Sequence, residues 1–136
     1  MRTTLAIAAL STALVVTGAP LAHASGGDGI IRTGSCSGSA DWKLKAKHDD
    51  GRIETEWEVD SNRSGQTWRV RIRDNGVLVV ATRATTGGAS GSFSVERRIA
   101  NRAGTDSLVA RARNLSSGQT CVGRLSLLQQ PRLPEG

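Results

Sequence analysis

The chain has 136 residues, and its 18 Lys and Arg exceed its 12 Asp and Glu, so that the formal net charge is +6. This length is enough for one domain and excludes a multi-domain enzyme. The composition also excludes a collagen-like repeat and a coiled coil.

Residues 1–24 have the features of a secretory signal peptide. Arg2 gives the start of the chain a positive charge, an apolar run extends from Leu5 to Val16, and Ala22-His23-Ala24 fits the small-x-small cleavage pattern. The apolar run is too short to cross a bilayer as a helix, which disfavours the alternative of an uncleaved membrane anchor. The sequence therefore predicts a secreted, extracellular protein that begins at Ser25 and has no stable membrane insertion after cleavage.

The two cysteines, Cys36 and Cys121, are predicted to form one disulfide that joins the first and last strands. An oxidising compartment favours disulfides, and two cysteines allow a single intramolecular pairing. A nucleophilic thiol or a metal site would need partners, but His48 is the one histidine left once His23 leaves with the signal peptide.

The mature chain divides into three parts by composition. We expect a flexible Gly/Ser-rich lead-in over residues 25–38, a single β domain over 39–128 and a frayed tail over 129–136.

A first hairpin is predicted where the segments DWKLKAKHD and RIETEWEVD flank Asp50-Gly51. Strict alternation of apolar and polar residues indicates half-buried strands, and Asp-Gly is a strong hairpin signal. A two-residue turn places Lys43 opposite Glu58 and Leu44 opposite Trp57. A shift by one residue would spoil every such pair.

A second hairpin is predicted around Asn75-Gly76, a dipeptide that type I′ turns prefer. A two-residue turn there would place Ile72 opposite Val79 and Val70 opposite Ala81. Three further strands are expected over about 92–98, 108–113 and 120–127.

Seven short strands at regular spacing, without a helical period, predict an antiparallel β-sandwich of immunoglobulin-like or fibronectin-III-like type. Trp57 and Trp68 are expected in the core between the two sheets. The chain departs from antibody domains in having no tyrosine. Its cysteines also join the first and last strands rather than the second and sixth.

Three segments of the chain, 36–62, 65–76 and 100–124, resemble a family of small secreted proteins of Actinobacteria with an immunoglobulin-like or fibronectin-III-like β-sandwich. The resemblance covers nearly all of the mature chain. It implies export and a single domain, and it carries no functional residues across.

The sequence contains no GxSxG, HExxH or Gly-rich phosphate-binding motif. His48 lies beside a hairpin turn with no second histidine in the mature chain. Asp49-Asp50 is a weak calcium signal and is typical of a turn. We therefore predict no catalytic residues, no metal site and no cofactor.

The charge is divided unevenly along the chain. Residues 25–62 have a net charge of −3, whereas residues 63–132 have a net charge of +9. If the third, fourth, sixth and seventh predicted strands form one sheet, the strand phase places many arginines on its outer face. This candidate binding face consists of Arg69, Arg71, Arg73, Arg111, Arg113 and Arg124, with Leu78, Val80, Val109 and Val122.

Clustered arginine is typical of polyanion binding, and arginine interleaved with aliphatic residues also suits a protein interface. The sequence therefore predicts a non-catalytic extracellular binding module for a protein partner or an anionic polymer, with weak self-association as a further option. The competing interpretation is compositional. Arg outnumbers Lys by fifteen to three, and a solvated basic face needs no partner.

Two other classes of function are alternatives. A secreted protease inhibitor would present a rigid exposed loop, for which TTGGASG (85–91) and NLSSGQT (114–120) are the candidates. A small-molecule carrier of neocarzinostatin-like architecture would have a cleft between the sheets. That second alternative is an analogy of fold alone.

Overall fold

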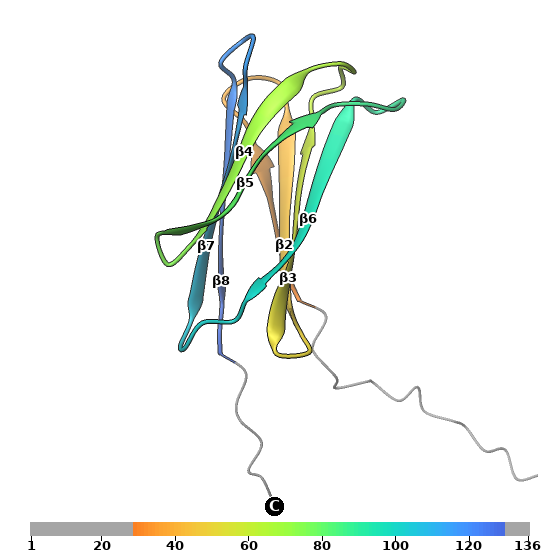
Figure 1. Cartoon of the computed structure of the whole chain (residues 1–136). Coiled ribbons are helices and arrows are strands. Elements are labelled where there is room, and N and C mark those ends of the chain that lie inside the picture. The colour runs from red at the N-terminus through yellow and green to blue at the C-terminus, as the bar shows by residue number, and fades with distance from the viewer. Residues whose placement is uncertain (1–28, 130–136) are drawn as a thin grey trace, which may run out of the picture.

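The computed structural model describes residues 29–129. The predicted signal peptide and all but the first residue of the predicted tail lie outside this range. The described chain forms eight strands and no helix (Figure 1). The strands are β1 (Ile30–Ser35), β2 (Asp41–Asp49), β3 (Arg52–Asp60), β4 (Thr67–Asp74), β5 (Val77–Thr85), β6 (Ser92–Ala100), β7 (Asp106–Asn114) and β8 (Thr120–Leu127).

The strands form two four-stranded antiparallel sheets that pack face to face. One sheet has the order β1-β2-β3-β6, and the other has the order β5-β4-β7-β8. The predicted antiparallel β-sandwich is confirmed, but it has eight strands and not seven, because β1 adds an edge strand to the first sheet. The predicted division of the other seven strands between the sheets is confirmed.

The prediction of a flexible lead-in over residues 25–38 is wrong for its second half, because β1 occupies Ile30–Ser35. This strand pairs with β2, with Ile30 opposite Ala46 and Gly34 opposite Trp42. A Cβ at Gly34 would lie 2.6 Å from the indole ring of Trp42. The glycine content that suggested a linker is thus what lets this edge strand lie against a large side chain.

The first hairpin has the predicted register, with Lys43 opposite Glu58 and Leu44 opposite Trp57. Its turn residues Asp50 and Gly51 have φ values of 51° and 75°. Positive φ at both positions is the type I′ geometry that matches the twist of paired strands.

The second hairpin has the predicted turn, but its predicted register is wrong beyond the first two pairs. Asp74 lies opposite Val77 and Arg73 opposite Leu78, but Ile72 lies opposite Val80 and not Val79. Val79 is therefore the extra residue of a β-bulge. Such a bulge reverses the faces of all the residues that follow it on its strand.

The core lies between the sheets and is built around tryptophan, as predicted. Trp57 and Trp68 are fully buried. The Trp57 ring centroid lies 5.6 Å from that of Trp42, and the Trp68 centroid lies 6.2 Å from that of Phe93. These tilted pairs fill the space in which a small-molecule carrier would need a cleft.

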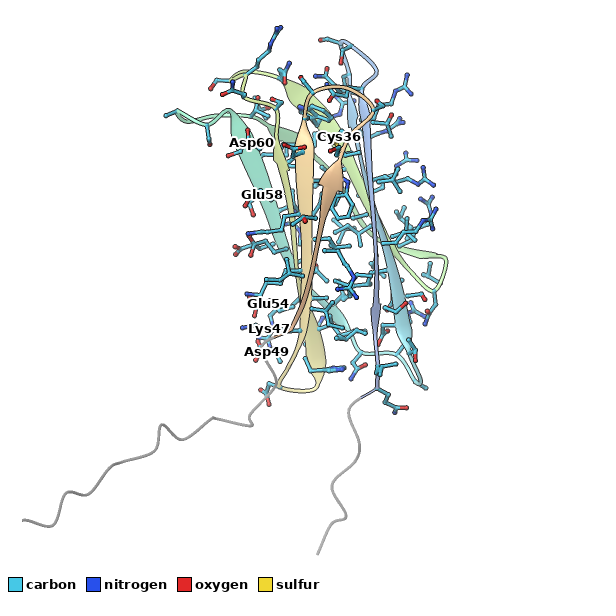
Figure 2. All side chains as sticks on the ribbon, turned by 180° about the vertical axis from the view of Figure 1, so that it is seen from behind. Cys36, Lys47, Asp49, Glu54, Glu58 and Asp60 are labelled. Carbon is cyan, nitrogen blue, oxygen red and sulfur yellow. A yellow bond between two sulfur atoms is a disulfide. The ribbon has the colours of Figure 1, made fainter. Side chains whose placement is uncertain are left out.

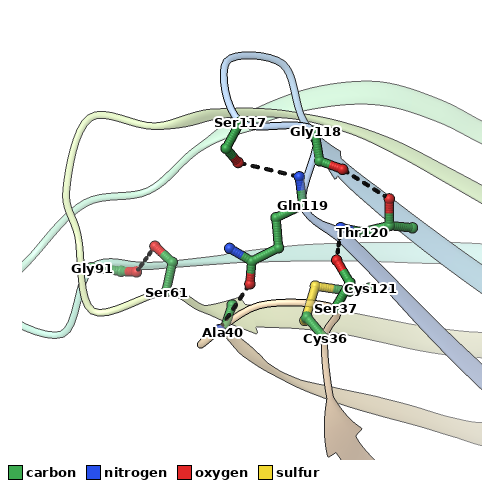
Figure 3. Close-up of a disulfide and its surroundings, with 10 residues drawn as sticks. All are labelled: Cys36, Ser37, Ala40, Ser61, Gly91, Ser117, Gly118, Gln119, Thr120 and Cys121. Atoms are coloured by element: carbon green, nitrogen blue, oxygen red, sulfur yellow. Dashed lines mark hydrogen bonds between the residues drawn. A yellow bond between two sulfur atoms is a disulfide. The ribbon is translucent and has the colours of Figure 1, made fainter.

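The predicted disulfide between Cys36 and Cys121 connects the end of β1 to β8 (Figure 3). Hydrogen bonds reinforce the same junction: the Ser37 amide donates to the Thr120 carbonyl at 2.8 Å, and the Thr120 amide donates to the Ser37 hydroxyl at 2.9 Å. The Ala40 amide donates to Oε1 of Gln119 at 2.9 Å. One side of the sandwich is thereby closed covalently.

Candidate functional site

The outer face of the β5-β4-β7-β8 sheet carries a dense group of arginines. Alternation along β4 and β7 sends every second residue into the core, so the residues between them point to solvent. All six arginines predicted for this face lie on it, joined by one that was not predicted. We call these seven residues the arginine face: Arg69, Arg71, Arg73, Arg83, Arg111, Arg113 and Arg124.

The strand register places several of these arginines directly opposite one another. Arg69 lies between Arg83 on β5 and Arg113 on β7, and Arg71 lies opposite Arg111. Like charges at directly opposed positions destabilise a sheet, each pair by roughly 0.2–1 kcal/mol. The arrangement therefore has a free-energy cost that a random scatter of the same charges would avoid.

Arg83 was missed because the predicted register paired it with Trp68 and so placed it in the core. The bulge at Val79 moves Arg83 to the outer face, opposite Arg69. The sequence did contain a signal for this shift, because arginine is almost never fully buried without a partner. The predicted register of the second hairpin was therefore wrong in burying Arg83.

The same bulge corrects one of the predicted aliphatic members of the face. Val80 is 5% exposed and belongs to the core, whereas Leu78, before the bulge, is 45% exposed. Val109 and Val122 lie on the outer side as predicted and are partly buried. The face therefore has fewer aliphatic contacts to offer a protein partner than the sequence suggested.

A trough of about 260 Å³ runs along the arginine face between β4 and β7. Arg69, Arg71 and Arg73 line it from β4, and Arg111 and Arg113 line it from β7. Ala112 on β7 and Thr120 on β8 complete the lining. Arg83 and Arg124 belong to the same face but lie outside the trough.

No guanidinium group of the arginine face forms a salt bridge or a hydrogen bond with another residue of the range 29–129. Elsewhere in this range every arginine except Arg63 has such a contact. Arg98 pairs with Asp49 at 3.4 Å and Arg102 with Asp74 at 3.8 Å, while Arg32, Arg52 and Arg97 donate to main-chain carbonyls. The arginine face thus contains seven of the eight arginines in residues 29–129 whose guanidinium groups have no partner among the described residues.

The outer face of the other sheet is charge-compensated, as the paired register predicted. Nζ of Lys43 lies 3.6 Å from Glu56 and 3.7 Å from Glu58, and Nζ of Lys47 lies 3.6 Å from Glu54. Figure 2 shows the labelled Lys47, Glu54 and Glu58 on the side of the molecule away from the nitrogen-tipped side chains of the arginine face. The two outer faces therefore differ sharply in charge.

His48, the histidine of the described chain, lies at the end of β2. Its Nε2 makes a 2.8 Å hydrogen bond with the carbonyl oxygen of Leu128, and its Nδ1 is buried with no partner among the described residues. The neighbouring Asp49 is held by Arg98. The His48 contact ties the chain just after β8 to the first hairpin, and the Asp49 contact ties β6 to it. In residues 29–129 no group of three or more His, Cys, Asp and Glu side chains could hold a metal ion.

A buried carboxyl pair, which sequence reasoning missed, lies where β4 ends and β7 begins. Asp74 and Asp106 are both fully buried. The pKa of Asp74 is raised to about 7, mainly by burial and further by the neighbouring carboxyl group of Asp106, while Arg102 opposes the shift. The Arg102 amide also donates to Asp106 at 3.3 Å. Asp74 directly precedes the predicted Asn75-Gly76 turn, and its burial depends on β7, which is distant in sequence, so the local pattern gave no sign of it.

The two loops proposed for a protease inhibitor are closed turns rather than extended segments. In 85–91, the Gly87 and Ser92 amides exchange hydrogen bonds across the loop, and Gly88 and Gly91 have positive φ. In 114–120, Oδ1 of the buried Asn114 accepts from the amides of Ser116 and Ser117 at 2.9 and 3.1 Å. Neither loop offers an extended main chain to a protease.

Residues 29–129 contain no helix that is long and apolar enough to cross a membrane. No protein-family model, no curated protein and no solved structure matches the chain at a significant level.

Proposed function

We propose that this protein is a secreted, non-catalytic module that binds anionic polymers through the arginine face. The single observation that carries the proposal is the opposition of like charges in the pairs Arg83–Arg69, Arg69–Arg113 and Arg71–Arg111, with no anion of the described chain beside them. A polyanion laid on the face would remove this repulsion and release counterions.

Charge segregation supports a polyanion over the other candidates. The arginine face carries seven positive charges and no carboxylate, whereas the opposite outer face pairs lysine with glutamate. An exposed side chain of Leu78 supports a protein interface as the second candidate. The burial of Val80 weakens that alternative.

The disulfide and the predicted signal peptide support secretion, because disulfides persist in oxidising compartments. The sequence resemblance to secreted actinobacterial proteins agrees with that interpretation. An extracellular anionic polymer is then the partner class that this location makes available.

Retention of the protein on immobilised heparin and on immobilised duplex DNA, while NaCl is raised, tests the proposal. We expect retention well above 150 mM NaCl and a steep salt dependence. The triple variant Arg69→Gln, Arg71→Gln, Arg111→Gln should elute at much lower salt. Elution of the wild-type protein below physiological salt from both supports would refute the proposal.

The matched control removes the same charge from the other sheet. The variant Lys43→Gln, Lys45→Gln, Lys47→Gln changes the net charge by the same amount but leaves the arginine face intact. It should elute near the wild-type salt concentration. Equal losses in the two variants would mean that net charge, and not the arginine face, causes retention.

A further inference from the structure

We infer that the trough between β4 and β7 holds one unbranched phosphate chain that runs parallel to the strands. This inference rests on the proposed function and specifies its ligand. It follows from the shape of the trough, the pairing of its arginines and the kinds of side chain that the face lacks.

Strand geometry makes the trough longer than it is wide. Along β4, Arg69 and Arg73 are four residues apart, which corresponds to about 14 Å of strand. Across the trough, β4 and β7 are neighbouring strands, about 5 Å apart in their main chains. A single chain can lie between the two rows of guanidinium groups. A rigid duplex, which carries its phosphates on the outside of a cylinder, would touch only the rims.

The arginines on the two sides of the trough are in register. Arg69 faces Arg113, and Arg71 faces Arg111 one step further along the strands. Each facing pair forms a clamp with a guanidinium group on either side. A phosphate in a linear chain has two free oxygens that diverge to opposite sides of the chain, so one phosphate can accept hydrogen bonds from both members of a clamp.

The two clamps are separated by two residues along each strand, or about 7 Å. The trough therefore favours a ligand with charged groups repeated along its length over a single compact anion. Arg73 lines the trough beyond the second clamp, opposite Val109, and gives the chain a third cationic contact.

The arginine face has no aromatic side chain that could stack on a base or a sugar. Trp57, Trp68 and Phe93 are buried between the sheets, and Trp42 packs against Trp57. Binding of single-stranded nucleic acid commonly depends on such stacking. Recognition here uses the charged backbone alone, so the ligand class is a linear polyphosphate or a polyol-phosphate chain, independent of any base.

Two double variants test this assignment on the same face. Arg71→Gln with Arg111→Gln removes one clamp inside the trough. Arg83→Gln with Arg124→Gln removes the same charge from the same face outside the trough. Affinity for fluorescently labelled long-chain inorganic polyphosphate is measured by anisotropy at 150 mM NaCl, and circular dichroism confirms that both variants fold.

We expect the variant Arg71→Gln with Arg111→Gln, inside the trough, to lose at least tenfold more affinity for polyphosphate than the variant Arg83→Gln with Arg124→Gln, outside it. Duplex DNA should bind the wild-type protein more weakly than polyphosphate of equal charge does. The two double variants should lose equal affinity for duplex DNA. Glycerol-phosphate polymer and inorganic polyphosphate, tested separately, distinguish the two sources of the phosphate chain.

Equal losses of polyphosphate affinity in the two variants, or tighter binding of duplex DNA, would overturn the assignment of the trough while leaving a polyanion-binding face. Tighter binding of polyglutamate than of polyphosphate would overturn the choice of phosphate. Absence of binding to every polyanion would overturn the proposed function as well.

Discussion

Arg71 on β4 lies directly opposite Arg111 on β7, in the middle of a sheet face that contains no carboxylate among the described residues. Opposed like charges weaken a sheet, and here both members of the pair line the trough. The same pair therefore links the stability of the fold to the occupancy of the face.

The first prediction concerns this link. Arg111→Gln should raise the free energy of unfolding by roughly 0.2–1 kcal/mol, because it removes a repulsion across β4 and β7. Urea denaturation at low salt measures the effect. Arg124→Gln is the control, since Arg124 lies opposite Val109 and not opposite a cation. A loss of stability in Arg111→Gln would show that the opposed arginines are not under repulsion.

A second prediction tests the bulge at Val79. Val80→Lys should destabilise the protein severely, by roughly 2–5 kcal/mol, because it places a charge in the core. Leu78→Lys should change stability by less than about 0.5 kcal/mol, because Leu78 is exposed. Thermal denaturation compares the two. Similar effects at both positions would contradict the observed register.

A third prediction concerns the glycine on β8 that faces the core. A Cβ at Gly123 would lie 2.7 Å from the ring of Trp57 and 2.8 Å from that of Trp42. Gly123→Ala should therefore cost roughly 1–3 kcal/mol through overpacking. Gly87→Ala is the matched control, because nothing lies within 4 Å of a Cβ there. Equal unfolding midpoints in urea for the two variants would refute this packing argument.

The pKa of Asp74 gives a fourth prediction. In the unfolded chain this carboxyl titrates near 3.8, and in the folded protein near 7. The folded state thus binds the proton more tightly, so the stabilising contribution is complete below pH 4 and is lost as the pH rises to about 7. The loss has an upper bound of about 4 kcal/mol.

The variant Asp74→Asn isolates the effect of Asp74 on stability. The other carboxyl groups titrate in both the variant and the wild-type protein, so their contribution to the pH dependence cancels. The difference in unfolding free energy between the variant and the wild-type protein should grow in favour of the variant between pH 4 and pH 8. Chemical denaturation across this range measures it. A difference that does not change with pH would exclude Asp74 as the titrating group.

The disulfide gives the fifth prediction. Cys36 and Cys121 are 85 positions apart, and the chain-entropy model assigns roughly 4.5 kcal/mol to a loop of this length. Reduction, or the double variant Cys36→Ser with Cys121→Ser, should lower the unfolding free energy by roughly 2–5 kcal/mol. Unchanged stability after reduction, verified by free-thiol titration, would contradict this expectation.

The sequence was most informative where local chemistry and pairing agree. In the first hairpin, Asp50-Gly51 sets the turn, and the Lys43–Glu58 and Leu44–Trp57 pairs confirm the register that it implies. Both the turn and the strand pairs point to one alignment. The structure then follows from residues within a single short segment.

The second hairpin shows where such reasoning ends. Asn75-Gly76 predicts the turn correctly. The bulge at Val79 depends instead on packing in the core, because it buries Val80 and leaves Arg83 on the outer face. A strand pattern without strict alternation, as in the run from Val77 to Ala81, does not reveal which face is buried. The trough and the Asp74–Asp106 pair depend on strands distant in sequence, so no local pattern reports them.

The termini of the described chain and the disulfide lie at opposite ends of the sandwich. Gly29 lies beside Ala46 and Lys47, and Leu128 is bonded to His48 at that same end, whereas Cys36 of the disulfide lies at the other end (Figure 2). A pulling force applied at residues 29 and 129 would peel β1 and β8 from their free ends toward the covalent bond. The bond would then carry the load, and the chain between the two cysteines, including most of the arginine face, would stay folded under tension.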